Sequence, residues 1–94
     1  MRDLAPTPDL APAPDREQVI ATMRDELRRI SPRLPADWPA SAPYRSELNL
    51  DSLDLVELVA RIEQHYGLLI PDGDLECFVS LETSADYVIT KAST

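Results

Sequence analysis

A single serine, Ser52, stands where an amphipathic helix is predicted to begin, with Asp51 before it and Asp54 two residues after it. A hydroxyl at a helix start can accept a hydrogen bond from an unpaired backbone N–H, so the serine fits a capping role. The same position also suits an attached phosphate, because free N–H groups and the positive end of the helix dipole stabilise an anion. Taken alone, these residues leave both interpretations open.

A second candidate chemistry is a hydrolytic triad, because the chain also contains His65. Thirteen positions separate His65 from Ser52, so one continuous helix would hold them about 20 Å apart. A general base must lie within about 3 Å of the proton that it abstracts. The G-x-S-x-G turn that exposes a hydrolase serine is also absent from the sequence. We therefore predict no catalytic residue and expect His65 to lie on the surface.

Metal and nucleotide chemistry find little support in the sequence. Residues 72–74 (DGD) are similar to the start of a calcium loop, but the twelve-residue ligand order and its terminal glutamate are missing. Gly67 and Gly73 are too few for a glycine-rich phosphate loop. Cys77 is the only cysteine, which excludes an intrachain disulfide, and we expect it to be a small buried apolar residue. Neither a metal site nor a nucleotide site is predicted.

The length and charge of the chain narrow its class. Its 94 residues fit one domain. Because no apolar stretch can span a bilayer and no signal-peptide pattern is present, we expect a monomeric cytoplasmic protein that does not insert into membranes. The formal net charge is −8, and residues 51–94 hold nine acidic side chains against two basic ones. Such a field repels nucleic acid and favours partners with basic surfaces.

The elements that must position Ser52 can be placed from the spacing of apolar residues. Residues 1–14 contain four prolines among alanine and aspartate and are predicted to be a disordered tail, which leaves residues 15–92 as the folded domain. A first helix is predicted to begin at Asp15, with Gln18 in a capping-box pattern, and to end at residues 31–32. The residues of its inward stripe are Val19, Ile20, Met23, Leu27 and Ile30. The charged residues of its outer face, expected in solvent, are Arg24, Asp25, Glu26, Arg28 and Arg29.

The remaining elements complete an all-α fold of four helices. Residues 31–50 carry four prolines and no helical period, which predicts a long loop between helices one and two. The expected anchors of this loop are Trp38, Tyr44, Leu48 and Leu50. The second helix is predicted over residues 52–66 and ends at Gly67. A short third helix at residues 72–78 and a last helix at residues 81–89, capped by Ser80, follow. The second helix has its inward stripe at Leu55, Leu58, Val59, Ile62 and Tyr66.

Three apolar residues of the second helix lie off that stripe. Leu53, Val56 and Ala60 recur at positions i, i+3 and i+7 beside Asp54 and Glu57, and are predicted to face outward. An exposed apolar strip with acidic neighbours is typical of a docking surface. Scattered apolar residues are also common on protein surfaces, so the strip by itself leaves both interpretations open.

From residue 44 to about residue 89 the sequence resembles the acyl carrier protein family without a gap. Residues 48–54 (LNLDSLD) are similar to the family's L-G-x-D-S-L-D, and residues 56–59 (VELV) continue the match. Residues 70–72 (IPD) and 86–87 (DY) fall where the family has the same letters. Each motif is weak alone, but together, in register over about half of the chain, they are specific for this family.

The resemblance implies a function for the serine. It implies that Ser52, between Asp51 and Leu53, is esterified with 4′-phosphopantetheine, which a phosphopantetheinyl transferase takes from coenzyme A. The thiol of this arm would hold an acyl group as a thioester and present it to fatty-acid, polyketide or specialised lipid enzymes with basic docking surfaces. The carrier itself would catalyse nothing. The family's enzyme-facing side of the second helix corresponds here to Leu53, Asp54, Val56, Glu57 and Ala60.

The chain departs from the family pattern at a few positions, and two rival functions remain. Asn49 stands where the family has glycine, a tolerable change because asparagine enters the left-handed region readily. Arg61, Gln64 and His65 make the later turns of the second helix less acidic than the family pattern. A peptidyl or aminoacyl carrier would share the fold and the serine, although the D-S-L-D context and acidic flank favour acyl cargo. An unmodified regulatory adaptor would keep only the fold, and the intact context of Ser52 argues against it.

Overall fold

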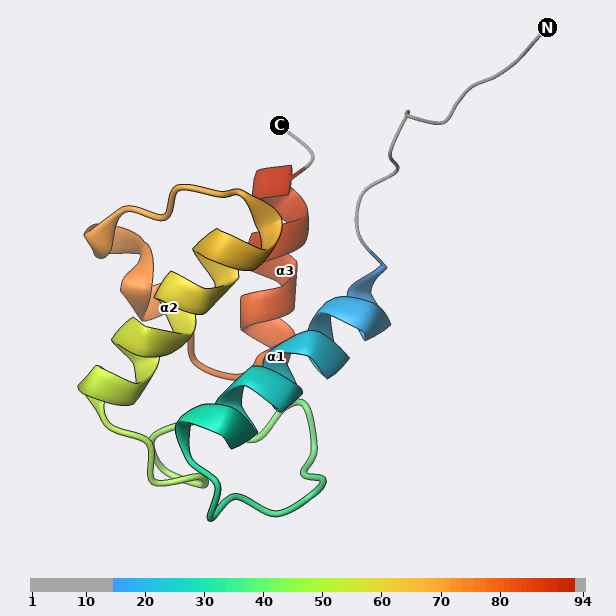
Figure 1. Ribbon diagram of the computed structural model, residues 1–94, viewed down its shortest axis with the longest axis vertical. Helices are drawn as coiled ribbons and strands as arrows, with labels where there is room; N and C mark the ends of the chain where they lie inside the picture. The colour runs from blue at the N-terminus through green and yellow to red at the C-terminus, as the bar shows by residue number, and fades with distance from the viewer. Residues whose placement is uncertain (1–14, 93–94) are drawn as a thin grey trace, which may run out of the picture.

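The computed structural model describes residues 15–92, which form three α-helices and one 3-10 helix. In chain order these are α1 (Arg16–Ile30), α2 (Ser52–Tyr66), η2 (Asp72–Cys77) and α3 (Leu81–Ala92). Helix α1 packs against both α2 and α3, and η2 contacts α2 and α3 (Figure 1). The predicted all-α fold with four helices is confirmed. The predicted tail, residues 1–14, lies outside the described residues.

One apolar core joins the helices. The inward stripes of α1, α2 and α3 bury their central residues, whereas Ile20, Ile30, Val59, Tyr66 and Ile89 lie half-buried at its edge. Helix α3 runs three residues beyond its predicted end, and Lys91 in its last turn suits the negative end of the helix dipole. The buried residues of the three stripes are Val19, Met23, Leu27, Leu55, Leu58, Ile62, Leu81, Ala85 and Val88.

The long loop between α1 and α2 is tied to the core at Tyr44, and all four predicted loop anchors are buried. The backbone N–H of Tyr44 donates to the carbonyl of Val79 (2.7 Å), and its carbonyl accepts from the N–H of Leu50 (3.0 Å). Its phenol oxygen lies 2.8 Å from the hydroxyl of Ser84 on α3. Burial raises the pKa of Tyr44 above its ordinary value, against a smaller opposite effect of the Ser84 hydrogen bond. A proline-rich segment without helical period is thereby held against the bundle.

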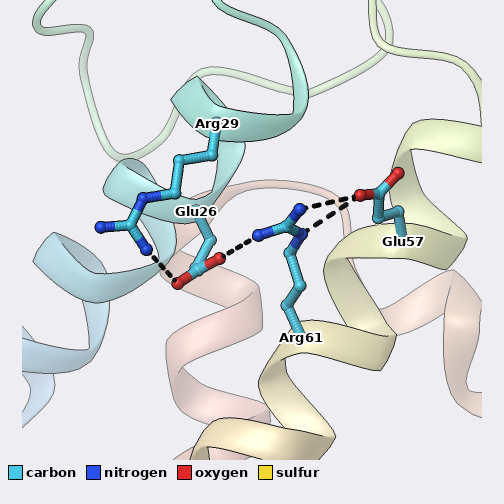
Figure 2. A network of polar contacts seen from close by, with 4 residues as sticks. All are labelled: Glu26, Arg29, Glu57 and Arg61. Carbon is cyan, nitrogen blue, oxygen red and sulfur yellow. Dashed lines mark hydrogen bonds and ion pairs between the residues drawn. The ribbon is translucent and has the colours of Figure 1, made fainter.

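Two charged residues of α1 that were expected in solvent pack against other elements. Arg24 bonds Asp37 (3.1 Å) and the carbonyl of Trp38 (2.9 Å), and its guanidinium lies over the Trp38 ring at 5.1 Å. The Glu26 side chain is only 15% exposed and pairs with Arg61 of α2 at 2.8 Å (Figure 2). The prediction of a solvated face was wrong at these two positions, because long side chains lie along the helix surface and meet charges from distant elements.

The segment after α2 is held by polar and aromatic contacts. The phenol of Tyr87 on α3 donates to the carboxylate of Asp74 in η2, and the rings of Phe78 and Tyr87 lie 5.1 Å apart. The predicted cap of α3 is confirmed, since the Ser80 hydroxyl accepts from the N–H of Thr83 at 3.3 Å. The prediction of a buried Cys77 was wrong: the thiol side chain is exposed. The 3-10 helix buries none of its own residues, and the next residue, Phe78, is buried with its ring against Tyr87.

Candidate functional site

The start of α2 is capped by Asp51. The Asp51 carboxylate accepts from the N–H of Asp54 (2.9 Å), and the Asp54 carboxylate accepts from the N–H of Asp51 (3.1 Å), which forms a complete capping box. Ser52 is therefore the first residue inside the helix. The capping interpretation of its hydroxyl is wrong, because an aspartate one position earlier already bonds the N–H group that a cap would satisfy.

Ser52 is exposed, and its hydroxyl makes no hydrogen bond to any residue that the structure describes. The first helical hydrogen bond is donated by Leu55 to the carbonyl of Asp51 (3.1 Å), so the N–H groups of Ser52 and Leu53 precede it. The hydroxyl therefore lies at the N-terminus of a fifteen-residue helix, beside unpaired N–H groups and the positive end of the helix dipole. The position therefore offers an accessible alcohol in surroundings that favour a phosphodiester.

The chain reaches Asp51 through a left-handed residue. Asn49 has φ +57°, the one positive φ of a non-glycine residue within the described part of the chain. Its carbonyl accepts from the guanidinium of Arg33 (3.1 Å), which ties the end of the loop to its beginning. Asparagine tolerates this conformation better than most residues, so it can replace glycine here. The expectation drawn for Asn49 from the sequence is confirmed.

A largely apolar pocket of about 600 Å³ opens beside Ser52. Loop residues, the first turns of α2, and η2 with the turn after it form its walls, so it exists only in the folded chain. Arg45 contributes a positive charge, and Asp72 and Glu76 contribute negative ones. The sequence motifs did not indicate this pocket, because its walls come from segments that are far apart in the chain. Its lining residues are Pro43, Arg45, Ser46, Ser52, Leu55, Asp72, Gly73, Leu75, Glu76, Phe78 and Val79.

The predicted outward strip of α2 is present as a surface. Leu53 is 77% exposed and Val56 is 51% exposed, and Ala60 follows them in the exposed class. Glu57 is exposed between them, whereas Asp54 is half-buried because its carboxylate turns back into the capping box. The helix thus brings all five predicted enzyme-facing residues to one side, next to Ser52. We call the surface made by Leu53, Asp54, Val56, Glu57 and Ala60 the docking strip.

Other candidate chemistry is not assembled by the fold. Ser52 and His65 lie at opposite ends of α2, and His65 is exposed with its ring against Tyr66 at 4.6 Å. Within residues 15–92 no three His, Cys, Asp or Glu side chains gather as a metal site. No helix in the same range is long and apolar enough to cross a membrane.

Comparison with known proteins agrees with this geometry. The family described as "Phosphopantetheine attachment site" matches residues 17–88. The acyl carrier protein of Rubrobacter xylanophilus is 35% identical over 78 residues, which cover 80% of this chain and 93% of that protein. Acyl carrier protein 2, mitochondrial, of Arabidopsis thaliana is 27% identical over 79% of this chain and 59% of its own length. A mitochondrial acyl carrier protein of Neurospora crassa is 33% identical over 61% of this chain and 42% of its own length.

The attachment of 4′-phosphopantetheine, which the family match implies, fits the residues present. The group needs an accessible hydroxyl and a place for a phosphodiester, and the start of α2 supplies both. Members of this family are carriers and not catalysts. From the matched residues and the geometry that they form, the chain belongs to the acyl carrier protein family and uses a covalent 4′-phosphopantetheine group.

Proposed function

We propose that Ser52 is the attachment point and that the protein carries acyl groups as thioesters on its 4′-phosphopantetheine arm. The observation that supports this most directly is the exposed Ser52 hydroxyl. It makes no hydrogen bond to residues 15–92 and lies at the N-terminus of α2, the positive end of the helix dipole. Asp51 supports the site by capping the helix, which leaves the serine available. Leu53, the exposed next residue, presents an apolar side chain beside it.

Loading requires a phosphopantetheinyl transferase and coenzyme A. The Ser52 oxygen forms a new bond to the phosphorus that bears the pantetheine, the phosphoanhydride bond of coenzyme A breaks, and the adenosine bisphosphate half leaves. A base on the transferase takes the hydroxyl proton, since no His, Lys or carboxylate of the described chain bonds the Ser52 hydroxyl. When bound, the arm supplies the thiol that holds the acyl group. This chain contributes access, orientation at the helix end, and the apolar pocket against which an acyl chain packs.

The test is modification of the purified protein by a transferase with coenzyme A, followed by intact mass and peptide mapping. We expect one addition, on the peptide that contains Ser52, and none in Ser52→Ala. Ser46→Ala is the matched control, because Ser46 is an exposed serine of the same pocket. Normal modification of Ser52→Ala, or loss of modification in Ser46→Ala alone, would overturn the assignment.

The delivery step uses the docking strip. We propose that transferases and acyl-handling enzymes of fatty-acid, polyketide or specialised lipid synthesis bind it through basic surfaces. Exposed Leu53 and Val56 offer apolar contact, and the acidic residues around them attract basic side chains.

We place this activity in the cytoplasm, and intact mass of the protein recovered from fractionated host cells would report both compartment and cargo. An aminoacyl group on the arm would indicate a peptidyl or aminoacyl carrier instead. A serine without the arm would indicate an unmodified regulatory adaptor.

A further inference from the structure

Arg61 is the only arginine or lysine of α2, and it lies at the edge of the docking strip. Its Nε and one terminal nitrogen contact the same carboxylate oxygen of Glu57, at 3.2 and 3.0 Å. Its other terminal nitrogen donates to Glu26 of α1 at 2.8 Å, and Arg29 donates to the second oxygen of Glu26 at 3.1 Å. Figure 2 shows the four side chains as one chain of alternating charges between the two helices.

The arginine is held firmly in this position. The Glu26 side chain is only 15% exposed, so leaving the oxygen that Arg61 bonds without a charged donor would be unfavourable, although Arg29 holds the other oxygen. The Arg61 side chain is 34% exposed and is bonded on both sides, which leaves it little freedom to turn toward solvent. The hydrogen bonds of Glu26 and then Glu57 raise the pKa of Arg61, so it stays charged at any working pH. Glu57 is therefore paired before any partner arrives.

The acidic groups of the helix thus differ in their availability. The carboxylates of Asp51 and Asp54 accept hydrogen bonds from backbone N–H groups, which are uncharged donors, so the net negative charge at the start of α2 remains. The Glu57 carboxylate faces a full positive charge at 3.0 Å, so its net contribution to the surface field is small. Beyond Arg61 the outward positions are Gln64 and His65, both exposed. The enzyme-facing side is acidic at its beginning and close to neutral in its later turns.

We propose that Arg61 is a specificity-determining residue, which neutralises Glu57 and so divides the docking strip into an acidic start and a nearly neutral end. This inference rests on the proposed carrier function. The face fits an acyl-handling enzyme whose surface is basic opposite Asp51 and Asp54 and carries neutral or acidic side chains opposite Arg61. An enzyme with a basic residue opposite Glu57 must compete with Arg61 and is repelled by it. Such an unfavourable contact is how one partner is selected over another.

A double-mutant cycle between Arg61→Ala and Glu57→Gln tests the inference. The readout is the affinity and association rate of the unmodified carrier for a phosphopantetheinyl transferase with a basic docking surface, at low and high salt. Glu57→Gln should weaken binding less in the wild-type chain than in the Arg61→Ala chain, because in the wild type Arg61 already occupies this carboxylate. Arg61→Ala should tighten binding about three- to fivefold at low salt by freeing Glu57, and adding Glu57→Gln should abolish that gain.

Arg28→Ala is the matched control for bulk charge. It removes the same positive charge from the exposed face of α1 and leaves Glu57 paired, so binding should change less than about twofold. Because Arg61→Ala leaves Glu26 short of a partner, the cycle is repeated with Glu26→Gln present, and thermal melting confirms that each variant is folded. Arg61→Lys keeps the charge and should resemble the wild type in binding.

Two results would overturn the inference: additive effects in the cycle, or equal gains from Arg61→Ala and Arg28→Ala. Failure of the carrier function itself would look different. In that case the wild-type protein would not be modified at Ser52, whatever the cycle shows. A modified wild type with an additive cycle would refute the role of Arg61 and leave the carrier function intact.

Discussion

At the scale of single residues, the division of labour between Asp51 and Ser52 decides what the helix start can do. Asp51 carries the structural role, since its carboxylate bonds the N–H of Asp54 and closes the capping box. The Ser52 hydroxyl makes no hydrogen bond to residues 15–92 and is left for chemistry. A sequence pattern with two polar residues side by side cannot say which of them is the cap. One hydrogen bond in the folded chain does.

This division predicts different stabilities for two alanine variants. Asp51→Ala should lower the free energy of unfolding by about 1 kcal/mol, because it removes a cap. Ser52→Ala should change it by less than about 0.5 kcal/mol, the range typical of exposed positions. Urea unfolding followed by circular dichroism measures both. A larger loss from Ser52→Ala than from Asp51→Ala would show that the serine hydroxyl supports the helix after all.

At the scale of elements, α2 faces two ways. Its inward side joins the core through Leu55, Leu58 and Ile62, and its outward side carries the docking strip. The same helix also reaches α1 through the pair between Arg61 and Glu26. The core contact, the docking strip and the ion pair with α1 therefore lie on three different faces of this fifteen-residue helix.

Charge reversal on two helices should separate a defined surface from bulk charge. Glu57→Lys puts a positive charge beside Arg61 in the docking strip and should weaken transferase binding several-fold at low salt. Asp25→Lys changes the net charge equally, on the exposed face of α1, and should have little effect. The difference should shrink at high salt, because exposed charges are screened. Binding is measured by fluorescence anisotropy. Equal weakening by both reversals would show that bulk charge, and not the docking strip, governs transferase binding.

The contact between η2 and α3 predicts a pH dependence. Burial first, and then the hydrogen bond to Asp74, raise the pKa of Tyr87 from 10.0 to about 12. The folded state therefore favours the protonated phenol, so its stabilisation is complete below about pH 10 and is lost as the pH rises toward 12.

The measurement is the free energy of unfolding at several pH values between 9 and about 12. Tyr87→Phe should flatten the fall seen in the wild type, and Asp74→Asn should flatten part of it. Burial also raises the pKa of Tyr44, so some fall should remain in both variants. A slope unchanged in Tyr87→Phe would mean that the phenol titrates alike in the folded and unfolded chains.

At the scale of the whole molecule, residues 15–92 share one apolar core, in which the three helical stripes and the loop anchors bury one another. The proline-rich residues 1–14 contain few large apolar side chains, so we predict that they contribute nothing to that core. Deletion of residues 1–13, which keeps Asp15 and its cap, should shift Tm by less than about 4 °C, as expected when stability changes by under about 1 kcal/mol. Calorimetry would contradict this with a shift of many degrees.

The sequence alone determined the helices, their inward faces and the candidate serine. These features depend on local properties: apolar residues at helical spacing, Gly67 in the left-handed conformation that ends α2, and the short motif around Ser52. Such features are readable because their physical causes lie within a few residues of each other.

Only the tertiary structure decided what depends on residues far apart in the chain. The pocket beside Ser52 needs Pro43, Leu55 and Phe78 from three segments, and the neutralised Glu57 depends on an arginine that Glu26 holds from another helix. The exposure of Cys77 was also decided by packing, since the neighbouring Phe78 is buried and packs against Tyr87 of α3. Local spacing carries no information on which distant side chain will fill a space or pair a charge, because packing in three dimensions makes that choice.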